Sequence, residues 1–198
     1  DFINKALESL DIAGWDSAPN VLGSVARLLA NAPRMEESNA WRYPIDLVAI
    51  LEAAFENRPD ASQSTAEMSD DDIDALVETL LDDKPQASVD ALVETLEKGI
   101  APDILAGVVA YTASVRIAQF HTSNEFGDWD TALHTFTFAN AVHMGLRRGQ
   151  SQDLVRGIFD AAMSIYLDRF LNIPAAKIPQ PTDHFDDVDA LLDNFDEL

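Results

Sequence analysis

Hydrophobic residues recur every three or four positions along most of this chain, which is the spacing of an amphipathic helix. The strict alternation that is typical of a half-buried strand is absent. Proline and glycine separate the helical stretches, as at Gly14, Pro19 and Gly149. We therefore predict an all-α fold, a single-domain helical bundle of about seven to nine helices. The predicted helices cover residues 2–10, 21–31, 45–56, 70–80, 90–96, 102–125, 129–148, 152–171 and 186–198.

The connections between these helices differ in character. Residues 31–46 contain two prolines and are predicted to form an irregular loop. Residues 57–70 are polar and lack any period, so we expect an exposed connection there. The string DALVETL occurs at 74–80 and again at 90–96. Two copies are too few for a repeat array, and we interpret them as two short antiparallel helices.

The segments 102–125 and 129–148 carry apolar side chains around nearly the whole helix circumference. A helix with this pattern is normally buried. Phe126 and Gly127 supply a tight corner between the two segments, and Asp128 is placed to cap the second helix. We therefore expect these two helices to form a buried hairpin at the centre of the bundle.

Ionisable residues interrupt this apolar hairpin, and burying them costs free energy unless they are paired or bind something. Asp130 and His134 are four residues apart and share one helix face, and His121 and Glu125 do the same on the preceding helix. The corner folds one pair toward the other, so two imidazoles and two carboxylates are predicted to converge. These ligand types suit iron, zinc or manganese in helical proteins. The pattern thus predicts a metal site made of these four residues.

His143 lies about half a turn out of phase with His134, so it faces elsewhere and is expected to contact a substrate or a metal ligand. His134, Asp130 and His143 are the candidates for acid–base catalysis. The alternative is that both pairs are ordinary hydrogen bonds at the surface or partly buried. The chain contains no HExxH motif and no repeated ExxH, so the spacing leaves this alternative open.

The formal net charge of −22 changes the list of expected partners. It repels nucleic acid and anionic membranes, so we expect neither, whereas a basic protein is compatible with it. The absence of cysteine excludes thiolate catalysis and an iron–sulfur cluster held by this chain, and it favours a cytoplasmic location. The sequence shows no apolar run long enough for a membrane span and no signal-peptide pattern, so neither is expected.

The last part of the chain, residues 183–198, is acidic and carries leucine, valine and phenylalanine at helical spacing. We treat residues 1–182 as the helical domain and 183–198 as an acidic amphipathic helix or tail. Its apolar side needs a surface to cover, either on its own domain or on a partner chain. His184, the remaining histidine, is expected at the surface.

Three strings resemble the helical domain of bacterial Rieske-associated proteins, which often precedes a Rieske [2Fe–2S] domain: MEESNAWRYPIDLVAILE (35–52), FHTSNEFGDWDTALHTFTFANAVH (120–143) and YLDRFLNIP (166–174). The central string also resembles, distantly, the questin oxidase-like group. The resemblance implies an oxidoreductase or redox-associated role with a Rieske or ferredoxin-like partner. Because the chain lacks cysteine, any cluster must lie on another chain or segment. The site residues inside the matching string are His121, Glu125, Asp130, His134 and His143.

Three hypotheses about function follow from the sequence. The first is a helical oxidoreductase that holds a metal or a small-molecule substrate between the two central helices. The second is a non-catalytic acidic interaction domain whose polar groups are satisfied structurally. The third is a carrier that binds a small apolar ligand between the same helices.

Overall fold

The computed structural model describes residues 1–32, 45–61, 64–149, 151–172 and 175–178. These residues form eight α-helices and two short 3₁₀ helices, and their β structure is limited to one isolated bridge. The predicted all-α fold is therefore confirmed. The α-helices are α1 (Phe2–Ala13), α2 (Ala18–Ala30), α4 (Leu47–Asn57), α5 (Asp70–Leu81), α6 (Pro85–Glu97), α7 (Pro102–Ala118), α8 (Phe126–Arg148) and α9 (Gln152–Leu167). The 3₁₀ helices are η1 (Trp15–Ser17) and η3 (Asp168–Asn172).

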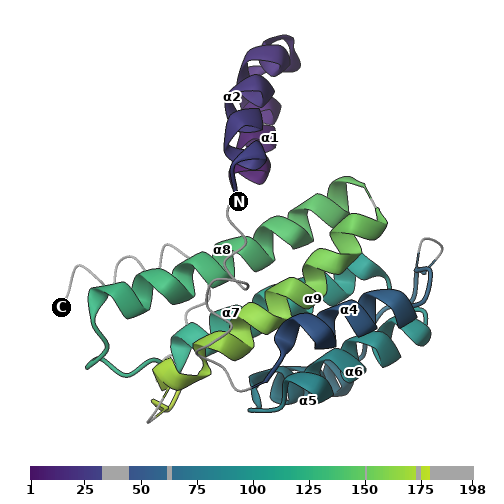
Figure 1. Cartoon of the computed structure of the whole chain (residues 1–198), viewed down its shortest axis with the longest axis vertical. Coiled ribbons are helices and arrows are strands. Elements are labelled where there is room, and N and C mark those ends of the chain that lie inside the picture. Colours follow the sequence, from purple (N-terminus) through teal and green to yellow (C-terminus); the bar gives the residue numbers. More distant parts are fainter. Residues whose placement is uncertain (33–44, 62–63, 150, 173–174, 179–198) are drawn as a thin grey trace, which may run out of the picture.

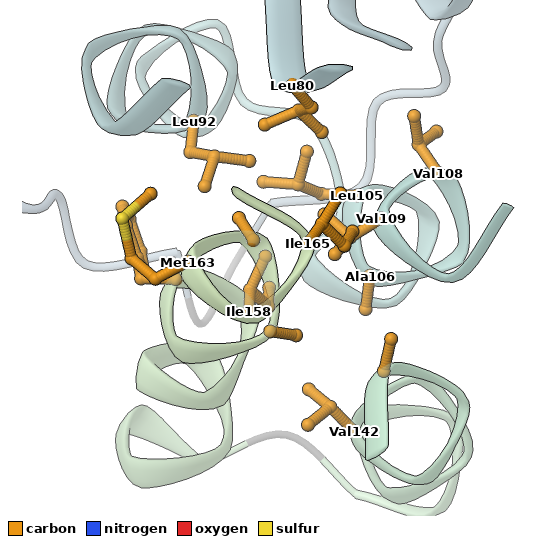
Figure 2. Close-up of a cluster of buried hydrophobic side chains, with 14 of the residues drawn as sticks. Leu80, Leu92, Leu105, Ala106, Val108, Val109, Val142, Ile158, Met163 and Ile165 are labelled. Atoms are coloured by element: carbon orange, nitrogen blue, oxygen red, sulfur yellow. The ribbon is translucent and has the colours of Figure 1, made fainter. Parts of the chain in front are cut away.

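The core of the bundle lies where α7, α8 and α9 meet α4, α5 and α6 (Figure 1). Aliphatic side chains from these helices point into one cluster, part of which is drawn in Figure 2. Leu80, Leu92, Leu105, Ile158 and Ile165 are completely inaccessible to water. Burying a side chain of this size stabilises a fold by about 1.5–3 kcal/mol, so this cluster holds the six helices together.

Helices α7 and α8 form the predicted central hairpin, but they are not buried to the same extent. Buried residues are spread along α7 from Pro102 to Arg116. Helix α8 buries only one face, which is formed by Ala132, Thr135, Ala139, Val142 and Leu146. The expectation that α8 is buried around its whole circumference is therefore wrong. The reason is that α7 and α9, its main neighbours among the described helices, leave its outer side open to solvent.

Helix α7 ends at Ala118, well before the end that the apolar pattern predicts. Two long-range hydrogen bonds hold the chain that follows in a turn. The side-chain amide of Asn124 donates to the carbonyl of Leu171 at 2.9 Å, and the N–H of Ala176 donates to the carbonyl of Gln119 at 2.7 Å. These bonds come from segments distant in sequence, which is why the local pattern does not reveal the end of the helix.

Helices α1 and α2 form a hairpin that stands away from the bundle (Figure 1). The hairpin touches α8 through an ion pair in which the Arg148 guanidinium lies 2.5 Å from the Asp11 carboxylate. Within the hairpin, α1 buries Ala6 and Leu10, whereas α2 buries none of its residues. A helix with the length and sustained apolarity needed to cross a bilayer does not occur among the described residues.

The connection between α4 and α5, which the sequence predicts to be exposed, is attached to the bundle. Ala61 is buried, and Ala66 forms an isolated parallel bridge with Ile100. The N–H of Ala66 donates to the Gly99 carbonyl and the Ala66 carbonyl accepts from the Ala101 N–H, each at 3.0 Å. Gly99 has a φ of +80°, a conformation that glycine adopts without steric cost. The connection is thus fixed to the corner between α6 and α7.

Two sequence predictions concern parts of the chain that the structure does not describe. Most of the predicted loop over residues 31–46 lies outside the described residues. The C-terminal segment 183–198, with His184 in it, lies outside them entirely. The division of the chain into residues 1–182 and 183–198 therefore stays a prediction.

Candidate functional site

Asp130 and His134 share a face of α8, as their spacing predicts, but that face is exposed. The His134 Nε2 atom lies 3.8 Å from Asp130 Oδ2, and the two side chains are 73% and 56% accessible to solvent. Both residues lie on the side of α8 opposite Thr135 and Ala139, which contact the bundle. The expectation that this pair is buried is wrong. A solvent-exposed contact of this kind contributes little to stability.

His121 and Glu125 do not share a helix face, because both lie in the turn between α7 and α8. The Nδ1 atom of His121 accepts a hydrogen bond from the Ser123 N–H at 3.1 Å and lies 2.8 Å from the Ser123 hydroxyl. Glu125, and not Asp128, is the N-cap of α8. The two residues form a capping box in which the Glu125 N–H donates to Asp128 Oδ2 at 3.1 Å. His121 and Glu125, two of the predicted metal ligands, therefore have local structural roles.

The four predicted metal ligands do not assemble into one site. Among the residues that the structure describes, no three His, Asp or Glu side chains lie together in an arrangement that could hold a metal ion. The predicted convergence of His121, Glu125, Asp130 and His134 fails because it requires a helix through residue 125, which the structure replaces with a turn.

His143 is half-buried between α8 and α7. Its ring lies against the backbone of Gly107, where an added Cβ atom would be 3.4 Å from His143 Nε2. Burial lowers the pKa of His143, the positive charge of Arg147 lowers it further, and Asp103 opposes both effects. The neutral ring is therefore favoured in the folded chain. In this position His143 is a contact between helices, and its predicted catalytic role stays untested.

A cluster of buried polar side chains lies elsewhere, where α7, α8 and η3 meet. We call Arg116, Thr135, Asp168 and Asn172 the Arg116 cluster; each is at most 9% exposed. The Arg116 guanidinium donates to the Asn172 side-chain oxygen at 3.2 Å and to the Leu81 carbonyl at the end of α5 at 3.1 Å. The Asn172 amide donates back to the Arg116 carbonyl at 3.0 Å. The cluster thus ties η3 to two helices of the bundle.

Asp168 is the titratable member of this cluster with the most unusual surroundings. Burial raises its pKa, while a hydrogen bond from Thr135 and the positive charge of Arg116 lower it by smaller amounts. The Oδ2 atom of Asp168 and the Nε atom of Arg116 are buried without a hydrogen-bond partner among the described residues. Buried polar atoms of this kind are unusual, and they mark the cluster as strained or functional.

A pocket of about 670 Å³ opens beside the Arg116 cluster, and Arg116 and Asn172 form part of its wall. At its mouth, the Arg169 guanidinium lies 2.5 Å from the Asp83 carboxylate and 3.9 Å from the centre of the Tyr166 ring. The pocket wall therefore combines apolar side chains, such as Leu81 and Phe170, with polar ones, and acidic and basic groups at the mouth are already paired with each other.

The Arg116 cluster is not apparent from the sequence pattern. Its members are contributed by three elements, and Arg116 and Asn172 are 56 positions apart, so no local spacing connects them. Two signals were present nevertheless. Arg116 is the single basic residue in the largely apolar sequence of α7, and Asp168 and Asn172 fall in the string YLDRFLNIP.

An apolar surface with no partner among the described residues lies on α2. Its members, which we call the α2 stripe, fall within one side of the helix at spacings of three, four and seven residues. They are Val21, Leu22, Val25, Leu28 and Leu29, and none of them is buried. Close by in the sequence, Ile12 is 90% exposed and Trp15 is 53% exposed. Contiguous exposed apolar residues are uncommon on monomeric proteins, and such a patch usually marks an interaction surface.

Together, the fold and these surfaces define an acidic all-α bundle with an apolar N-terminal hairpin. No family model, curated protein or solved structure matches the chain. The resemblance to the helical domain of Rieske-associated proteins therefore stays a prediction.

Proposed function

We propose that this protein is an acidic helical interaction domain that binds another protein through the α2 stripe. The observation that carries the proposal is that α2 has an apolar side but no buried residue. Among the described elements, α2 is in substantial contact only with α1 and η1. An amphipathic helix gains most of its stability from covering its apolar side, so α2 requires a surface that the described part of this chain does not supply.

The composition of the α2 stripe supports the same proposal. Leu22, Leu28 and Leu29 are 36–52% exposed, and completing the burial of three such side chains would release several kcal/mol, by the general figure of about 1.5–3 kcal/mol per fully buried side chain. Trp15, next to the start of α2, is of the residue type that contributes most to binding in protein interfaces. Binding of a partner is thus the arrangement that would stabilise the hairpin.

The other hypotheses find less support in the geometry. The predicted acid–base pair Asp130–His134 is exposed, and among the described residues the predicted metal ligands do not gather into one site. A redox role with a Rieske or ferredoxin-like partner rests on the resemblance alone, and it is compatible with an interaction domain. A carrier of small apolar ligands would need an enclosed apolar cavity, whereas the pocket beside Arg116 is open and has the charged side chains of Asp83, Arg116 and Arg169 in its wall.

Site-specific photo-crosslinking in living cells tests the proposal. A photoreactive phenylalanine analogue replaces Leu22 or Leu29 in the α2 stripe, and in control chains it replaces Leu133 or Phe170, which are exposed to a similar extent on the bundle. We expect a discrete protein adduct from the two stripe positions and none from the two control positions.

Mass spectrometry of the crosslinked peptides then identifies the bound protein. A stripe that reacts no more than the controls would contradict the proposed function. Adducts that formed equally at all four positions would also contradict it, because that pattern indicates nonspecific binding and not a defined surface.

A further inference from the structure

We infer that the partner of the α2 stripe is a second copy of this chain, so that two N-terminal hairpins associate into a four-helix bundle. This inference rests on the proposed function, because it names the occupant of the same surface. It is carried by the distribution of charge over the hairpin and by the shape of the hairpin.

The chain as a whole is strongly acidic. With 35 acidic and 13 basic residues, two copies repel each other over most of their surfaces. Among the described helices, α2 is the one without a carboxylate: from Ser17 to Ala32 there is no Asp or Glu, and the single charged residue is Arg27. A basic partner would find no carboxylate to pair with on this helix. A like-charged second copy can approach here with little repulsion, since the two faces that meet are apolar and carry no carboxylate.

The acidic residues of α1 do not oppose this contact, because their charges are engaged locally. Glu8 accepts hydrogen bonds from Lys5 and Asn4, each at 2.8 Å. Asp11 is paired with Arg148 at 2.5 Å and accepts a hydrogen bond from the Trp15 indole at 3.2 Å. The carboxylates of α1 are thus turned toward bases and donors of the same chain.

The shape of the hairpin suits a two-fold contact. Helices α1 and α2 have 12 and 13 residues, so two antiparallel hairpins of equal length can pack side by side over their whole length. A two-fold axis places the α2 stripe of one copy against the α2 stripe of the other, which is a self-complementary contact. Because the hairpin stands away from the bundle (Figure 1), the two acidic bundles need not approach each other.

Sedimentation equilibrium of the purified full chain at physiological salt tests the inference. We expect a reversible monomer–dimer equilibrium with a monomer mass of 21.7 kDa. Leu22→Asp and Leu29→Asp should each weaken dimerisation by about 30-fold or more, since each places a carboxylate in the contact. Leu22→Ser removes the apolar contact without adding a charge, so its effect on dimerisation measures the apolar contribution alone. Leu133→Asp adds the same charge on exposed α8 and should leave the dimer unchanged.

Circular dichroism and thermal unfolding show that the variants remain folded, which is expected because α2 has no buried residue. A chain that stays monomeric at all accessible concentrations would overturn the inference, and so would a dimer indifferent to the stripe variants. A monomer that dimerises only after deletion of residues 183–198 would also overturn it, by indicating that the chain's own tail covers the stripe.

The two proposals fail in different ways. If photo-crosslinking at Leu22 yields an adduct with a different protein while the purified chain is monomeric, the interaction domain stands and the second copy is excluded. If neither position of the stripe forms an adduct and the chain is monomeric, both proposals fall.

Discussion

The Arg116 side chain joins elements that are far apart in the sequence. It links the end of α5 and the 3₁₀ helix η3 to α7, and its charge partly compensates Asp168. Buried ionic groups seldom stabilise a fold more than well-packed apolar residues would, because removing them from water is costly. We therefore regard the cluster as a set of contacts that fixes the position of η3 on the bundle. The energetic cost of burying these groups is largest at Asp168.

Replacing Asp168 by asparagine should reveal this cost as a dependence on pH. The pKa of Asp168 is raised in the folded chain above its usual value of 3.8, so the protonated carboxyl favours folding below that value and the contribution is lost as pH rises through the folded pKa. The Asp168→Asn chain cannot ionise at this position. Its free energy of unfolding, relative to the unmodified chain, should therefore increase as pH rises from about 4 toward 7.

Urea unfolding of both chains at a series of pH values measures this difference. Below pH 4 both side chains are neutral and the difference should be constant, which provides the internal reference. A difference that decreases as pH rises would show that the Arg116 charge outweighs burial and that the carboxylate stabilises the fold.

At the scale of single elements, the way α8 meets its neighbours depends on two glycines. Gly107 of α7 lies against the edge of the His143 ring, and Gly157 of α9 lies against Val142. Both glycines are inside helices, where alanine is favoured by about 1 kcal/mol. The difference between them is the space available for a methyl group.

The matched substitutions Gly107→Ala and Gly157→Ala should change stability in opposite directions. At Gly107 the new Cβ would be 3.4 Å from His143 Nε2, an ordinary contact, so we expect stabilisation by about 0.5–1 kcal/mol. At Gly157 it would be 3.0 Å from Val142 Cγ2, and this stiff, buried side chain has little room to move. We expect destabilisation by about 1 kcal/mol or more there.

Chemical denaturation of the two variants beside the unmodified chain decides the matter. Equal effects at both positions, in either direction, would mean that helix propensity alone governs these sites and that the contacts with α8 are more adaptable than the distances indicate.

The positions of the helices were predictable from the sequence because the apolar periodicity is a local signal. The existence of each described α-helix follows from spacings such as those around Leu105 and Ile158. The end of α7 was not predictable, because the turn that replaces the expected helix depends on hydrogen bonds from Leu171 and Ala176. Local sequence contains no trace of such long-range partners.

The predicted convergence of His121, Glu125, Asp130 and His134 was wrong for a related physical reason. Apolar residues spread around α8 do not indicate which of its sides meets α7, so the exposure of Asp130 and His134 could not be derived from periodicity. The Arg116 cluster was missed because its members come from separate elements. The unpaired state of the α2 stripe is likewise a property of the assembled fold, and the amphipathic pattern of α2 alone did not reveal it.

At the scale of the whole molecule, the net charge of −22 opposes compaction, because carboxylates repel one another more strongly in the folded chain than in the expanded one. Ion pairs such as Lys98–Glu94 and Lys84–Asp82 are exposed and neutralise only a small part of this charge. Dissolved salt should therefore act on the stability of the whole fold.

Raising sodium chloride from about 0.05 M to about 1 M, which shortens the screening length from more than 10 Å to about 3 Å, should increase the free energy of unfolding. Thermal unfolding across this range measures the effect. Because salt would also favour association of two like-charged copies, the Leu22→Asp chain serves as the control for dimerisation. A fall in the unfolding temperature of the Leu22→Asp chain with added salt would show that attractive ion pairs outweigh the repulsion between carboxylates.

The attachment of Ala66 to the corner between α6 and α7 has a consequence for how the chain tolerates damage and change. The two hydrogen bonds at Ala66 divide the link between α4 and α5 into two short spans that meet at this one anchor. A protease that cleaved the span before Ala66 would leave the position of α5 in the bundle unchanged. Foreign sequence inserted into that span would, in the same way, extend outward as a local appendage. Engineers who wish to display a peptide on this scaffold would therefore place it on the N-terminal side of Ala66.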